Sequence, residues 1–162
     1  MIGLKMDFFL GSLCVDINLW DRNTKQFEKI AAVFDTGAHT THIDTNVLEY
    51  LGYDLNEAAK SYINTAAGDG LQVNNTAIDN MKIGDLELGT VLVNFSELPV
   101  QFPVILGMNV IKEFNINLDF KNGIISMEPN FDANSKISIE RFNKSSSRFG
   151  MWAINENITQ ER

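Results

Sequence analysis

The residues best suited to chemistry stand together early in the chain, at Asp35, Thr36 and Gly37. An apolar run from Ile30 to Phe34 precedes them, so a strand would end on the acid and present its carboxylate on a tight turn. Gly37 has no Cβ and allows backbone to approach closely. A carboxylate held in this way can exchange protons with a bound molecule. The commoner role of Asp in such a string is to cap a turn, and the three residues alone leave both interpretations open.

Two histidines and one cysteine are the other side chains that we consider, as metal ligands or as a nucleophile. His39 and His42 lie on a segment that we expect to be extended, where positions i and i+3 point to different faces, so a shared metal ion is not expected. Cys14 is the single cysteine, which excludes an internal disulfide and a cysteine-based zinc cluster. Because it stands in an apolar run, we expect a buried small hydrophobe rather than a nucleophile.

The composition is that of a globular protein. The chain has 162 residues, which fits one domain, and 44% of them are hydrophobic, with eleven phenylalanines. The formal net charge is -8. A nucleic acid or an anionic membrane would require a basic surface, so neither partner is expected.

The sequence carries no strong targeting signal. It has no run of ~18 apolar residues, so we expect no membrane span. The apolar run over residues 8–14 follows Lys5 as in a signal peptide, but Asp7 interrupts the entry to the run, the run is short, and no small-x-small cleavage site follows. The low cysteine count favours a reducing compartment, and we expect a cytoplasmic protein.

Alternating apolar residues predict successive β-hairpins. A strand that begins at residue 13 is expected to bury the face formed by Leu13, Val15, Ile17 and Leu19. A turn over 21–25 leads to a return strand over 27–35. A later hairpin rises over 62–67, turns at Gly68-Asp69-Gly70 and returns over 71–83. The inward face of this return is expected to carry Leu71, Val73, Ala77, Met81 and Ile83.

Two short helices are predicted among these strands. Asp44 is suited to be an N-cap and Gly52 to stop the helix that follows. The apolar stripe between them consists of Val47, Leu48 and Leu51. The second helix follows an apolar run that ends at Gly107, because residues 108–114 show helical spacing.

The composition changes near the C-terminal end. Strands are predicted over 116–120 and 124–127, and after Pro129 asparagine, serine and lysine become common while apolar residues become scarce. We therefore divide the chain into a domain of residues 1–129 and an extension of residues 130–162, which could form an interface or a cover segment.

Three separated features together resemble a known family. They are Phe34-Asp35-Thr36-Gly37-Ala38, the glycine-tipped hairpin after Thr65-Ala66, and Ile105-Leu106-Gly107-Met108-Asn109-Val110-Ile111. In this order they resemble the retropepsin-like aspartic proteases, the single-domain retroviral type, and the prokaryotic members in particular. The resemblance covers roughly residues 8–127. It implies an all-β fold, a closed β-barrel of hairpins with one or two short helices.

The resemblance implies a catalytic role for Asp35, as the acid. Thr36 would make interlocking hydrogen bonds beneath the site, and Gly37 would provide a close backbone contact. Residues 105–107 would form a loop that crosses under Asp35, and Asn109, in the helix after it, would complete that element.

The resemblance also implies a flap over the substrate, formed by residues 65–71. The residues expected to contact substrate are Ala38, His39, Thr65, Ala66, Ala67, Gly68, Asp69, Gly70 and Leu106. The sequence departs from the family at two positions. His39 stands where a small or acidic residue is more usual, and His42 replaces what is commonly an aliphatic residue.

Peptide hydrolysis by carboxylates needs two of them, because one must accept a proton from water while the other, protonated, polarises the scissile carbonyl. The chain contains one Asp-Thr-Gly. The mechanism therefore implies a homodimer with Asp35 of each copy facing across a two-fold axis, acting on a peptide or protein substrate without metal or organic cofactor.

Two other functions remain open from the sequence. One is a retropepsin-like module that binds peptides or dimerises with little or no proteolysis. The other is a metal-binding β protein that uses the histidines and aspartates, which fits the residues least well.

Overall fold

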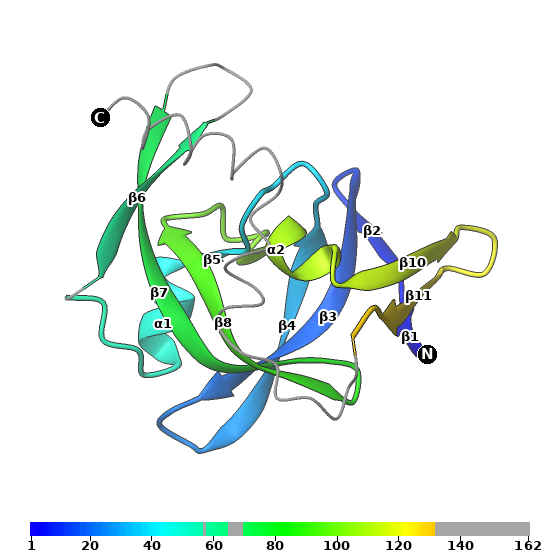
Figure 1. Cartoon of the computed structure of the whole chain (residues 1–162), viewed down its shortest axis with the longest axis horizontal. Coiled ribbons are helices and arrows are strands. Elements are labelled where there is room, and N and C mark those ends of the chain that lie inside the picture. Colours follow the sequence, from blue (N-terminus) through cyan, green and yellow to red (C-terminus); the bar gives the residue numbers. More distant parts are fainter. Residues whose placement is uncertain (57, 65–69, 132–162) are drawn as a thin grey trace.

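The computed structural model describes residues 1–56, 58–64 and 70–131. This part of the chain is mostly strand, with two short helices (Figure 1). The elements follow in the order β1 (Ile2–Lys5), β2 (Asp7–Phe9), β3 (Ser12–Asp21), β4 (Gln26–Phe34), β5 (His42–Asp44), α1 (Thr45–Tyr50), β6 (Ala59–Asn64), β7 (Gly70–Ile83), β8 (Leu86–Ser96), β9 (Val104–Leu106), α2 (Met108–Ile111), β10 (Phe114–Asp119) and β11 (Ile124–Pro129).

Eight strands form the main sheet, in the order β2-β3-β4-β9-β5-β8-β7-β6. An additional pairing of β3 with β7 links the two halves, so that the pairings from β3 through β4, β9, β5, β8 and β7 return to β3. The apolar faces of these strands meet inside this ring, as the core includes Ile17, Ile43, Val93 and Leu106, none of them exposed. The predicted all-β fold of hairpins with two short helices is confirmed.

The β3–β4 hairpin follows the predicted alternation. Val15, Ile17 and Leu19 are buried on one face of β3, and the turn lies between Asp21 and Gln26. Cys14 is also buried, as expected, and pairs with Val33 across the hairpin. This hairpin delivers β4 to the Asp-Thr-Gly turn.

Helix α1 has the predicted boundaries. The Asp44 side chain accepts a hydrogen bond from the backbone N–H of Asn46, which satisfies a free donor of the first turn. Leu48 and Leu51 are fully buried. Gly52 adopts a φ of +80°, the left-handed conformation that ends many helices and that glycine adopts without strain.

The inward face of β7 differs from the prediction at Ala77. Ile78, and not Ala77, belongs to the buried core, whereas Met81 and Ile83 are buried as expected. The register of β7 against β8 shifts between Ile78 and Met81. Such a bulge inserts an extra residue and exchanges the two faces of a strand, so a constant parity along residues 71–83 was wrong.

The N-terminal residues form an element that the sequence did not reveal. Strand β1 pairs with β11, which also pairs with β10, in a separate three-stranded sheet near the N-terminus (Figure 1). Helix α2 is shorter than the helical spacing suggested, because Phe114, the last residue of that pattern, is already the first residue of β10.

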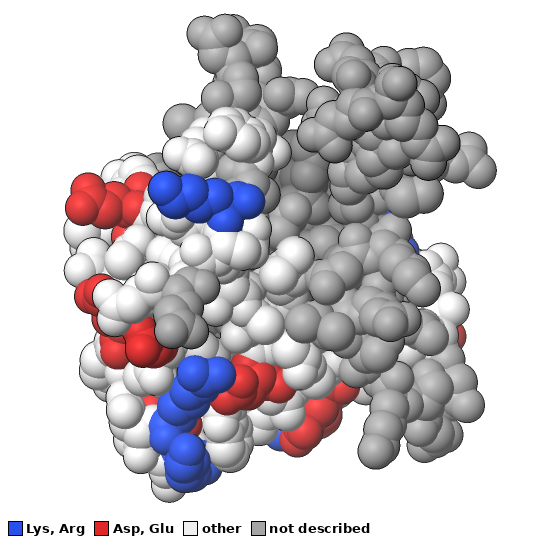
Figure 2. Space-filling view, turned by 60° about the vertical axis from the view of Figure 1, so that its left-hand side comes forward, with Lys and Arg blue, Asp and Glu red and all other residues white. Residues whose placement is uncertain are grey.

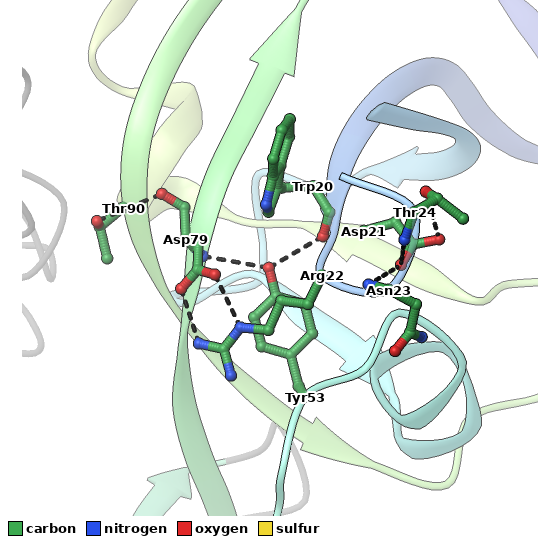
Figure 3. Close-up of polar contacts among 8 residues, drawn as sticks. All are labelled: Trp20, Asp21, Arg22, Asn23, Thr24, Tyr53, Asp79 and Thr90. Atoms are coloured by element: carbon green, nitrogen blue, oxygen red, sulfur yellow. Dashed lines mark hydrogen bonds and ion pairs between the residues drawn. The ribbon is translucent and has the colours of Figure 1, made fainter. Parts of the chain in front are cut away.

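A polar cluster fastens the β3–β4 turn to α1 and β7 (Figure 3). Arg22 forms two hydrogen bonds to the Asp79 carboxylate, at 2.7 and 2.8 Å, and its guanidinium lies 4.3 Å from the centre of the Tyr53 ring. The buried Tyr53 hydroxyl donates to the Trp20 carbonyl at 3.0 Å and accepts from the Asp79 N–H at 3.2 Å. Burial raises the pKa of Tyr53 to about 12.

Charged side chains are dispersed on the described surface. On the face in Figure 2, acidic side chains lie between a few separated basic ones, with no continuous basic area among the described residues. Within the same residues, no helix has the length and apolar character needed to cross a membrane.

Candidate active site

Asp35 directly follows strand β4, and strand β9 pairs with β4 in parallel. Val33 pairs with Ile105 and Phe34 with Leu106. The backbone N–H of Asp35 then donates to the Leu106 carbonyl at 3.1 Å. The structure thus brings together two of the three segments that carry the resemblance, with the 105–107 run directly beside the acid.

The Asp35 carboxylate is held by its own turn. Its Oδ1 accepts a hydrogen bond from the Gly37 N–H at 2.7 Å, and its carbonyl accepts one from the Ala38 N–H at 3.3 Å. A Cβ on Gly37 would lie 3.1 Å from the same Oδ1, closer than most side chains allow. The Asp35 side chain is half-buried, and within the described residues Oδ2 has no hydrogen-bond partner. One oxygen therefore orients the group and the other stays available.

A buried network beneath the turn joins Thr41, Asn109 and Gly107. The Thr41 N–H and hydroxyl donate to Asn109 Oδ1 at 2.8 and 2.9 Å, and the Gly107 N–H donates to Thr41 Oγ1 at 3.1 Å. Asn109 Nδ2 donates to the Leu92 carbonyl at 2.9 Å. Thr41 was not singled out by the sequence. In the sequence, Thr41 is a hydroxyl residue four positions after Gly37, and nothing in that pattern indicates that it is buried.

Helix α2 fastens the loop after the acid. The N–H groups of Met108 and Asn109 donate to the carbonyls of Ala38 and His39, at 2.7 and 3.0 Å. A Cβ on Gly107 would lie 2.5 Å from the carbonyl carbon of Thr40, so only glycine fits where the two segments cross.

A pocket of ≈ 200 Å³ opens beside the Asp35 turn. Its lining consists of Gly37, Ala38, His39, Thr40, His42, Asn94 and Ile105. Two predicted substrate contacts, Ala38 and His39, are among these residues. Leu106 is not, because its side chain is fully buried in the core and its contribution to the site is the carbonyl that holds Asp35.

His42 forms one wall of the pocket. Its Nε2 lies 2.8 Å from Ser96 Oγ. Burial lowers the pKa of His42, an effect that the nearby Asp44 opposes. Burial raises the pKa of Asp44 itself, but hydrogen bonds from Leu98 and Asn46 outweigh it and lower this pKa overall, so Asp44 stays ionised.

The predicted flap lies mostly outside the described residues. Its hairpin is present, because β6 pairs with β7 up to Asn64 and Gly70. Thr65, Ala66, Ala67, Gly68 and Asp69 fall outside the described ranges, and their roles stay predictions. In the part of the chain that the structure describes, no three His, Cys, Asp or Glu side chains gather as a metal site.

Comparisons with known proteins agree on one family. A family model described as "gag-polyprotein putative aspartyl protease" matches residues 25–113, just over half of the chain. Among solved structures, a retropepsin-like aspartic protease from Rickettsia conorii matches with a TM-score of 0.54 and 18% sequence identity, over 78% of this chain and 88% of that one. That likeness is one of fold, and no curated protein matches the sequence. The chain belongs to the retropepsin-like family of aspartic proteases.

Proposed function

We propose that the protein is an aspartic endopeptidase in which Asp35 of two identical chains activates a water molecule for peptide hydrolysis. The observation that carries this proposal is the state of the Asp35 carboxylate. Gly37 fixes one oxygen, Leu106 fixes the backbone, and the second oxygen has no partner within the described residues. Asp54 also caps its turn through one oxygen, but Asp35 differs from it in standing beside the 105–107 segment, whose Leu106 carbonyl holds the Asp35 backbone.

The proposed chemistry needs a pair of acids at short distance. Two close carboxylates cannot both ionise readily, so they share one proton. The ionised member accepts a proton from water as the water oxygen attacks the carbonyl carbon, while the protonated member donates to the carbonyl oxygen. Collapse of the tetrahedral intermediate then transfers a proton to the leaving amine. No metal or organic cofactor takes part in these steps.

A homodimer would supply the second acid. Thr36 and Gly37 are exposed beside Asp35, where a two-fold related copy could approach. The β6–β7 hairpin of each copy would cover the substrate. We further propose that residues 1–129 form the protease domain, that residues 130–162 are an interface or cover segment, and that the protein acts in the cytoplasm.

Proteolysis and dimerisation can be tested on the purified chain. Cleavage of casein, a disordered substrate, is measured across pH for the wild type, for Asp35→Asn and for Asp85→Asn, a matched change at an exposed turn. We expect activity in the wild type and in Asp85→Asn and none in Asp35→Asn. Light scattering should show a dimer.

Two results would contradict the proposal. A verified dimer that cleaves nothing at any pH would leave a peptide-binding or dimerisation module as the function. A chain that stays monomeric at high concentration yet cleaves casein would contradict the shared pair of acids.

A further inference from the structure

The pocket beside Asp35 contains a buried side-chain amide, that of Asn94. Asn94 in β8 is only 5% exposed. Its backbone N–H donates to the Thr41 carbonyl, but its side-chain carboxamide forms no hydrogen bond with any described residue. Buried polar side chains are almost always paired, because an unpaired one loses its bonds to water without replacement. A buried, unpaired amide on a pocket wall therefore indicates a ligand that completes its hydrogen bonds.

The sheet register places this amide on the same surface as the catalytic turn. Asn94 pairs with His42 in β5, and His42 pairs with Ile105 in β9. Neighbouring paired residues share one face of a sheet, so the three side chains form a continuous row. Ile105 in turn pairs with Val33, two residues before Asp35. The pocket is thus joined to the acid through both the β9–β4 ladder and the turn at Gly37.

The pocket offers neutral hydrogen-bonding groups. Among the residues that the structure describes, its lining includes no Asp, Glu, Lys or Arg. Burial lowers the pKa of His42, so its imidazole is mostly neutral near pH 7. Ser96 Oγ lies 2.8 Å from His42 Nε2 and 3.4 Å from the Glu97 carbonyl. In the tautomer in which Ser96 donates to that carbonyl and accepts from Nε2–H, Nδ1 of the neutral ring is an acceptor.

We propose that this pocket binds a carboxamide side chain, Asn or Gln, of the substrate close to the scissile bond; this inference rests on the proposed protease function. A carboxamide has both a donor and an acceptor, as does Asn94, so one ligand group can pair with both atoms. A volume of ≈ 200 Å³ suits a single side chain. A carboxylate or an ammonium ion would find no opposite charge among the described lining residues, and an aliphatic side chain would leave the Asn94 amide without a hydrogen bond.

The test uses peptides that differ at one position. In each set, one of the two residues on either side of the scissile bond is Asn, its near-isostere Leu, or Asp. At one of these positions we expect wild-type kcat/KM for the Asn peptide to exceed that for the Leu peptide by about tenfold, as one well-made hydrogen bond allows. Asn94→Leu should abolish this preference while cleavage of the Leu peptide persists. Asn115→Leu, an exposed position on β10 in the other sheet and outside the pocket lining, should retain it.

Binding to the Asp35→Asn protein separates this inference from the proposed function. If no peptide is cleaved but the Asn peptide binds the Asp35→Asn protein more tightly, and Asn94→Leu removes the difference, the pocket assignment holds and proteolysis fails. If peptides are cleaved with Leu or Asp preferred at all four positions in the wild type, the pocket assignment fails and proteolysis stands. Because that second outcome needs no pocket variant, it decides the question even if Asn94→Leu does not fold.

Discussion

Asn109 accepts two hydrogen bonds from Thr41, one from the backbone N–H at 2.8 Å and one from the hydroxyl at 2.9 Å. Both residues are buried, and the Thr41 hydroxyl also accepts from the Gly107 N–H. This contact joins the segment after the Asp-Thr-Gly turn to the start of α2. It therefore sets the position of the loop on which the Asp35 carboxylate is held.

Replacing Asn109 with alanine should strongly destabilise the fold. The change removes the acceptor of the buried Thr41 N–H and hydroxyl and the donor to the half-buried Leu92 carbonyl, which should cost about 3 kcal/mol of unfolding free energy. Urea unfolding followed by circular dichroism measures the effect. Asn115→Ala, an exposed position on β10, is the control and should change stability by less than about 0.5 kcal/mol. Equal stability of the two variants would show that the network is not important for folding.

Gly107→Ala should disrupt the site from below. Its Cβ would lie 2.5 Å from the Thr40 carbonyl carbon, and backbone there cannot move without displacing the Leu106 carbonyl that binds Asp35. We expect a loss of about 3 kcal/mol in stability, together with loss of casein cleavage. Gly3→Ala has no atom within 4 Å of its new Cβ and should behave as the wild type. An active, stable Gly107→Ala protein would contradict the close crossing.

Tyr53 should make stability fall at alkaline pH. Burial raises its pKa from the ordinary tyrosine value of 10.0 to about 12, so between these values the folded state retains a proton that the unfolded chain has released. The stabilisation by the neutral hydroxyl is thus complete below pH 10 and is lost as the pH rises through 12. Tyr53→Phe removes the hydroxyl and with it this pH dependence. It should lower the free energy of unfolding by about 2 kcal/mol at neutral pH, because the Trp20 carbonyl and the Asp79 N–H lose their hydrogen-bond partner.

Urea unfolding of both proteins from about pH 8 to about pH 12, which spans the two pKa values of Tyr53, tests this pH dependence. The difference in stability between the wild type and Tyr53→Phe should shrink as the pH approaches 12. A constant difference over that range would show that the Tyr53 hydroxyl is not protected from ionisation in the fold.

Subunit mixing should reveal whether two Asp35 side chains share one site. A tenfold excess of Asp35→Asn protein over a fixed amount of wild type should reduce cleavage about tenfold, because most wild-type chains then pair with an inactive partner. The loss should develop with incubation time as subunits exchange, and a freshly made mixture serves as the control. Unchanged activity after long incubation would indicate that each chain acts alone.

Local sequence patterns determined several parts of this protein. The alternation in residues 13–19 specified the buried face of β3, and the Asp44 and Gly52 signals specified the ends of α1. These features depend on neighbours only a few residues away, so their physical causes are present in the sequence itself. The position of Asp35 at the end of an apolar strand was visible for the same reason.

Tertiary structure alone decided the pairings between distant segments. Strand β1 alternates over only four residues, too few to predict a strand, and it is defined by its partner β11, which lies more than a hundred residues later. The bulge near Ile78 and the burial of Thr41 likewise depend on what the neighbouring strands provide. Asn94 is the sharpest case, because an asparagine in a strand carries no sign of being unpaired. Only the assembled sheet, which removes its amide from water beside Asp35, gives that residue a function to test.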